Sequence, residues 1–238
     1  MRAEILFPEL CNLFAEQRNM QYLRLCAPGL EFTQTHNTAA PLFASEDVGF
    51  IYLGSLSEQK QRLAHQRLQP YAGRLGELIQ NGTVMLFTGN AYELLGKYIQ
   101  FNGERYDTLG IFDFYTVSDT SKRHNSHFLG TFEDIRLVGN KSQYSFTYGD
   151  FPGYLASVQG GIGHNPGDLY EGIRAGNLLG THLLGPLLIN NPPFTKKLLR
   201  MLKQPDTLAF EDEVNKAYQL RLGELTAPGA RFAIGEHG

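Results

Sequence analysis

The stretch Thr83-Val84-Met85-Leu86-Phe87-Thr88-Gly89-Asn90-Ala91-Tyr92-Glu93-Leu94-Leu95-Gly96 decides the fold of this chain. Its apolar run, 84–87, is typical of a buried parallel strand. The chain then turns at Thr88-Gly89-Asn90, and the apolar positions that follow predict the start of a helix. A strand that turns at once into a helix is the arrangement by which α/β hydrolytic enzymes present a nucleophile. Here the tip of the turn carries Gly89, which has no side chain to react.

Strands and helices alternate on the N-terminal side of this stretch. Apolar or alternating runs predict strands at 4–7, 30–35 and 48–53. Helices are expected from Pro8, with Glu16 facing outward, from Ser57, which is placed to cap its helix, and from Pro70 to Gln80. The alternation predicts an α/β fold with three layers, in which helices cover both faces of a mostly parallel sheet.

Beyond Gly96 the sequence changes to short β-rich runs separated by glycines, and these predict added antiparallel strands at 109–117, 127–137 and 143–148. Strand, turn and helix are expected again over 177–186, followed by helices at 194–202 and 206–222, the second capped by Asp206. We therefore expect a main domain over 1–204, a C-terminal helix at 205–225 packed on it, and a loose tail at 226–238.

Composition and charge exclude several classes of protein. The net charge of -3 over 238 residues argues against a nucleic-acid-binding surface. No stretch approaches the roughly 18 apolar residues of a membrane span, and the N-terminus does not read as a signal peptide. The two cysteines, Cys11 and Cys26, form no Cys-x-x-Cys motif, so we expect a reduced, cytoplasmic protein in which Cys11 is a buried thiol.

Further motifs point to a family. The opening Leu6-Phe7-Pro8-Glu9-Leu10-Cys11-Asn12-Leu13-Phe14 resembles a Leu-Tyr-Pro-Asp-Leu-Leu-Asn-Leu-Tyr start, and 180–188 resembles a Gly-Thr-Tyr-Leu-His-Gly-Pro-Leu-Leu ending. On these motifs, and on weaker matches across 4–202, the chain resembles class I glutamine amidotransferases of the cobyric-acid-synthase-like branch, above all the GatD family. That resemblance implies a flavodoxin-like three-layer fold and glutaminase chemistry beside a Mur-ligase-like, ATP-dependent partner, which amidates D-glutamate in the peptidoglycan stem peptide.

The departures from the family pattern fall on the chemistry. Gly89 stands where the family has its nucleophilic cysteine, and Leu184 stands where it has its catalytic histidine. Glutaminase chemistry needs a thiolate to attack the carboxamide and a histidine to move the proton. Since neither glycine nor leucine can do this, we expect a degenerate amidotransferase-like protein with a binding or scaffolding role and no catalytic activity.

Two alternatives remain open. An active site could be displaced to Thr88, Asn90 and His182, since His182 lies two positions before Leu184 on the same strand face. The old pocket could instead bind glutamine or another small amide or amino acid, with candidate pocket residues at Gly54, Ser55, Thr88, Gly89, Asn90, Glu93 and His182.

The other polar residues singled out from the sequence are interpreted without a catalytic or binding role. Glu93 is interpreted as a charge near a helix start, His164 as a solvated loop residue, and His124 and His127 as part of a solvated hairpin tip. The seven histidines show no zinc spacing, and there is no phosphate-binding loop or dinucleotide fingerprint. We therefore expect neither a metal nor a cofactor.

Overall fold

The central sheet has six strands, in the order β13-β14-β4-β3-β1-β2. In the computed structural model, which describes residues 1–234, these strands are β1 (Arg2–Leu6), β2 (Glu31–Thr35), β3 (Phe50–Leu53), β4 (Val84–Thr88), β13 (Ile173–Ala175) and β14 (Leu178–Thr181). All neighbours are parallel except β13, which runs antiparallel to β14 at one edge. Every residue of β3 and β4 is buried, as expected for central strands covered on both sides.

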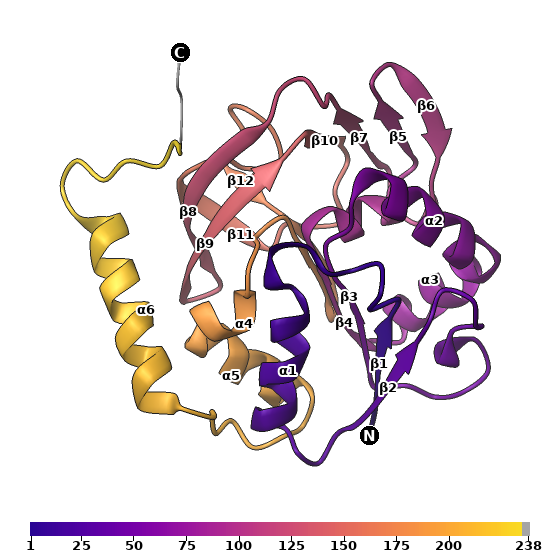
Figure 1. Ribbon diagram of the computed structural model, residues 1–238, viewed down its shortest axis with the longest axis horizontal. Coiled ribbons are helices and arrows are strands. Elements are labelled where there is room, and N and C mark those ends of the chain that lie inside the picture. The colour runs from indigo at the N-terminus through magenta and orange to yellow at the C-terminus, as the bar shows by residue number, and fades with distance from the viewer. Residues whose placement is uncertain (235–238) are drawn as a thin grey trace.

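Helices cover both faces of this sheet, so the predicted three-layer α/β fold is confirmed (Figure 1). One face packs against α1 (Gln17–Cys26), α4 (Leu187–Asn190) and α5 (Pro192–Met201), and the other against α2 (Glu58–Leu68) and α3 (Ala72–Gln80). Alternate residues of β4 divide between the two cores: Leu86 packs in the first and Phe87 in the second. The apolar run at 84–87 therefore serves two cores at once.

The β-rich runs predicted after Gly96 do form strands, but these lie in two further sheets of four strands each and are not added to the central sheet. Neighbouring strands in these sheets are antiparallel, except that Tyr98–Phe101 pairs with Phe114–Ser118 in parallel. One contains β5 (Tyr98–Phe101), β6 (Glu104–Asp107), β7 (Phe114–Ser118) and β10 (Ser145–Gly149). The other contains β8 (His124–Phe132), β9 (Ile135–Gln143), β11 (Ala156–Gly160) and β12 (Tyr170–Glu171).

The C-terminal helix α6 (Glu211–Thr226) lies against β8 and β9, where Tyr218 and Leu225 pack on Leu129 and Val138. After α6 the chain returns to β8, and Ala233 forms a bridge with Ser126. Residues 235–238 of the tail predicted at 226–238 lie outside the described residues.

Two helix starts differ from the prediction. The first α-helix begins at Gln17 instead of Pro8, because Phe14 and Ala15 have left-handed backbone angles that an α-helix cannot include; only a short 3₁₀ turn, Leu13–Ala15, precedes it. Glu16, predicted to face outward, is fully buried as a result. The last helix begins at Glu211 and is not capped by Asp206, which pairs with Arg200 instead.

Two sequence-based expectations about single residues are borne out. The Ser57 hydroxyl accepts a hydrogen bond from the backbone N–H of Lys60 and caps α2. Cys11 is buried, and both cysteines are free thiols. Within residues 1–234, no helix combines the length and the apolar character that crossing a membrane requires.

Candidate active site

A sharp elbow follows β4. The strand ends at Thr88, and the 3₁₀ helix η4 (Gly89–Leu95) begins at the next residue. Gly89 has φ +61°, a left-handed conformation that is strained for residues with a side chain and free of that strain for glycine. A Cβ built on Gly89 would lie only 2.5 Å from Cβ of Ser55 and 3.0 Å from its Cα. The space for a side chain at the tip of the elbow is therefore filled by Ser55.

A cavity of about 100 Å³ opens above the elbow. Among the residues singled out from the sequence, those that line it are Ser55, Gly89, Asn90, His182 and Leu184. Its wall also includes Phe14, Arg123 and Ser145, which come from three other parts of the chain. Gly54, Thr88 and Glu93 are buried but are not among the lining residues. Four of the seven sequence-predicted pocket residues therefore line this cavity, and three do not.

A buried carboxylate, Glu16, lies beneath the elbow. It accepts hydrogen bonds from the hydroxyls of Thr88 and Tyr52, the second at 3.0 Å. The Asn19 amide, at 3.3 Å, and the backbone N–H of Gly185, at 3.3 Å, complete a set of four donors. Burial raises the pKa of Glu16, and the hydrogen bonds oppose that rise. Nothing in the sequence singled out Glu16, because its burial follows from the left-handed turn before α1.

A second buried carboxylate, Glu93, lies beside the cavity and pairs with His182. His182 Nε2 is 2.7 Å from Oε1 of Glu93, and Nδ1 is 2.8 Å from the hydroxyl of Tyr92. Glu93 also accepts hydrogen bonds from Gln61, at 2.8 Å, and from Ser145. Glu93 lies near a helix start, as interpreted from the sequence, and it is also a buried partner of His182. Because both imidazole nitrogens are engaged, His182 has no free nitrogen to accept a proton from a nucleophile.

The displaced pair considered from the sequence is not assembled. Thr88 bonds to Glu16 and Tyr52, whereas His182 bonds to Glu93 and Tyr92. Among the described residues there is no hydrogen bond between Thr88 and His182. Within residues 1–234 there is also no group of three His, Cys, Asp or Glu side chains that could hold a metal ion.

The strand end that carries His182 is held by a buried ion pair. Lys141 Nζ lies 3.5 Å from Glu171 Oε1, and both side chains are fully buried. Glu171 also accepts a hydrogen bond of 2.8 Å from the backbone N–H of His182. Burial lowers the pKa of Lys141, and the carboxylate of Glu171 opposes that shift. The pair therefore helps to fix the backbone at His182.

Three histidines interpreted as solvated have buried or half-buried places. His164 is 2% exposed, stacks on Phe151, and bonds through its two nitrogens to Asp168 and to the carbonyl of Gly172. His124 and His127 are half-buried on β8. The interpretation of His164 as a solvated loop residue is wrong, because Phe151 covers its ring and both of its nitrogens bond to other groups of the chain.

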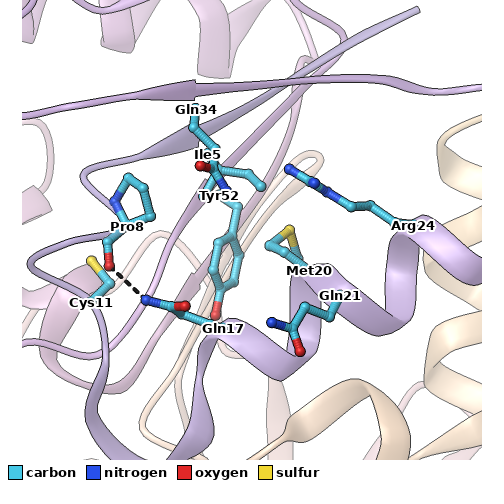
Figure 2. Close-up of a pocket in the computed structure, with 9 residues that line it drawn as sticks. All are labelled: Ile5, Pro8, Cys11, Gln17, Met20, Gln21, Arg24, Gln34 and Tyr52. Carbon is cyan, nitrogen blue, oxygen red and sulfur yellow. Dashed lines mark hydrogen bonds between the residues drawn. The ribbon is translucent and has the colours of Figure 1, made fainter.

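A second cavity, also of about 100 Å³, lies between α1 and the sheet (Figure 2). Figure 2 shows the Gln17 amide donating to the carbonyl of Pro8, close to the sulfur of Cys11. The ring of Tyr52 lines this cavity, and its hydroxyl bonds to Glu16 and Thr88 under the elbow. Tyr52 therefore spans the distance between the second cavity and the elbow.

The fold is that of a glutamine amidotransferase. The structure superposes on a solved glutamine amidotransferase with a TM-score of 0.58 at 14% identity, over 84% of this chain and 99% of that one. It superposes on a glutamine amidotransferase of Thermotoga maritima with a TM-score of 0.52 at 9% identity, over 94% of each chain. At these identities the likeness establishes the fold alone.

Sequence comparison then gives the family. The chain is 30% identical over 207 residues to the lipid II isoglutaminyl synthase (glutamine-hydrolyzing) subunit GatD of Staphylococcus aureus, across 87% of this chain and 83% of the relative. It is 24% identical over 209 residues to the subunit of the same name in Streptococcus pneumoniae, across 82% of this chain and 77% of the relative. No family model matches the chain. This chain belongs to the GatD family.

Proposed function

We propose that this chain is a GatD-like subunit that does not hydrolyse glutamine. In this proposal it is a non-catalytic binding or scaffolding subunit beside a Mur-ligase-like amidating partner in cell-wall metabolism. The observation that carries the proposal is the elbow: Gly89 offers no nucleophile, and Ser55 occupies the place of a side chain there. Loss of the attacking group removes most of the rate in enzymes of this kind.

The groups around the elbow support the same reading. Leu184, at the position where the family has its histidine, contributes an apolar side chain to the cavity wall. The nearest imidazole is that of His182, and both of its nitrogens are engaged by Tyr92 and Glu93. In this proposal the site therefore has neither a base to activate a nucleophile nor a proton donor for the departing ammonia.

The partner is proposed from the relatives. Both curated relatives are named as subunits of lipid II isoglutaminyl synthase, and this chain covers most of their length. A retained fold with an altered site fits a subunit whose remaining task is to bind. The reduced, cytoplasmic location proposed from the sequence is consistent with two free, buried cysteines.

A glutaminase assay tests the proposal. The purified chain is incubated with glutamine, alone and with a co-expressed Mur-ligase-like protein, and ammonia is measured. The S. aureus relative, which is named as glutamine-hydrolyzing, serves as the positive control. We expect ammonia release at the level of buffer alone in both cases, together with co-elution of the two proteins. Glutamine-dependent ammonia release that His182→Ala abolishes, in a variant that circular dichroism shows to be folded, would establish the displaced active site instead.

A stand-alone binding protein for a small amide or amino acid is the second candidate. Gln143 lines the cavity, and its amide oxygen is buried without a hydrogen-bond partner, which leaves an acceptor for a ligand N–H group. Isothermal titration with glutamine separates the two candidates. Glutamine binding by a chain that does not associate with a ligase-like protein would favour the stand-alone candidate.

A further inference from the structure

The helix α6 presents one exposed face. Of its sixteen residues, Val214, Tyr218 and Leu225 are buried against the rest of the molecule. Phe210, directly before the helix, is 65% exposed and Leu220 is 63% exposed. Figure 1 shows α6 at the edge of the molecule, where no other helix or strand covers its outer side. Phe210 and Leu220 are ten residues apart and have charged residues between them, so the exposed surface of α6 is of mixed apolar and charged character.

A cavity of about 450 Å³ extends this face toward β9 and α4. Glu213, Ala217 and Arg221 form part of its wall on the α6 side. Their spacing of four residues places them on successive turns of one helix face. The surface therefore consists of a small central residue with an acid on one side and a base on the other.

The charged side chains of Glu213 and Arg221 can still bind a group from outside the chain. Among residues 1–234, no cation forms an ion pair with Glu213. Arg221 donates to Glu224 at 2.9 Å and contacts His127 at 2.6 Å. A guanidinium carries five N–H donors, so Arg221 can also bind a carboxylate from outside the chain.

We propose that two copies of this chain pair through α6, antiparallel, about a two-fold axis at Ala217. Glu213 and Arg221 are each four residues, or about 6 Å along the helix axis, from Ala217. In an antiparallel pair, Glu213 of each copy therefore lies level with Arg221 of the other. Ala217 allows the close approach at the crossing point, and Leu220 and Phe210 become buried.

The self-complementary pattern favours a second copy as the occupant. A two-fold interface requires that one patch match itself, with residue i facing j and j facing i. An acid and a base equidistant from a small residue meet that requirement. A single pair of helices is at the small end of specific interfaces, so we expect a dissociation constant on the order of 10–100 μM. This inference does not depend on the proposed function.

Sedimentation velocity on the full chain, over a concentration series, tests the pairing. We expect the wild type to associate, and E213R and R221E each to weaken association by roughly tenfold or more, because like charges then face each other. Mixed in equal amounts, the two variants should associate with each other within about threefold of the wild-type affinity, since each mixed contact again joins opposite charges.

Two controls complete the design. D212R makes the same change of charge on the opposite side of α6 and should leave association unchanged. Circular dichroism and thermal melts confirm that each variant is folded. A wild type that is monomeric throughout the series overturns the proposal. So does a mixture of E213R and R221E that associates no better than either variant alone, or a set of variants whose only defect is in binding a ligase-like partner.

Discussion

Ser55 occupies the volume that a side chain on Gly89 would need, with its Cβ 2.5 Å and its Cα 3.0 Å from the Cβ position of residue 89. The closest atoms of Ser55 include a backbone atom, so a rotation of the hydroxyl does not free the space. The elbow and the loop after β3 therefore fit each other as they stand, and a change at one requires a change at the other.

A cysteine at residue 89 and a histidine at residue 184 should not by themselves confer glutaminase activity. We expect G89C/L184H to release ammonia from glutamine at the wild-type background, because the new side chain at residue 89 collides with Ser55. Urea denaturation should show G89C destabilised by roughly 2–4 kcal/mol, from backbone strain and overpacking. The matched variant S55G/G89C should recover roughly half of that loss. Glutaminase activity in G89C/L184H with Ser55 intact would contradict this account of the elbow.

The Glu93 and His182 pair should be strongly coupled. Each of E93Q and H182A should lower the free energy of unfolding by roughly 3–5 kcal/mol, since each leaves a polar partner buried without its bond. The double variant should cost less than the sum of the two, by roughly 1–3 kcal/mol. Chemical denaturation of the four proteins measures this, and strict additivity would show that the two side chains do not interact in solution.

The buried Glu16 should give stability a specific pH dependence. Its folded pKa is raised above the ordinary value of 4.5 by burial. The contribution of Glu16 to the free energy of unfolding is therefore complete below about pH 4.5, and it is lost as the pH rises through the folded pKa. At low pH the protonated Glu16 carries one O–H donor, whereas the amide of E16Q carries two N–H donors that face other donors, so E16Q should cost roughly 1–3 kcal/mol there. The stability difference between wild type and E16Q should shrink as the pH rises; a difference that grows with pH would contradict the prediction.

The Cys11 thiol should be inert in the native protein. Burial raises its pKa from 9.0 to about 12. The thiolate is the reactive form, so reaction with Ellman's reagent at pH 8 should be roughly a thousandfold slower than for an exposed thiol. C26S isolates Cys11 for this measurement, and urea should release full reactivity. By the same shift, the thiol's contribution to stability is complete below pH 9.0 and is lost as the pH rises toward about 12.

Much of the fold was predictable because its signals are local. The run 84–87 is apolar on both sides, and β4 is central in the sheet. The positions at which the helices begin were harder to predict. Phe14 and Ala15 adopt left-handed angles that these residue types do not signal, and they delay the first α-helix to Gln17. At α6, Phe210 takes the N-cap position without a side-chain cap, so the sequence rules for capping pointed elsewhere.

The candidate site was likewise predictable only in part. Motifs around Gly89 and His182 located the elbow and the adjacent strand end. The partners came from the tertiary structure: Glu16 arrives from the loop before α1, Gln61 from α2 and Ser145 from β10. Contacts between residues so distant in sequence produce no periodic pattern in the sequence of a single chain. The position of Ser55 against Gly89 produces none either.

The ion pair of Lys141 and Glu171 has an evolutionary consequence. A single substitution at either position strands the opposite charge in the interior, so a lineage reaches an apolar replacement only through a less stable intermediate. The two positions are therefore constrained as a pair, whatever chemistry the neighbouring cavity carries. Charges in the interior of this chain are by themselves no sign of present-day activity.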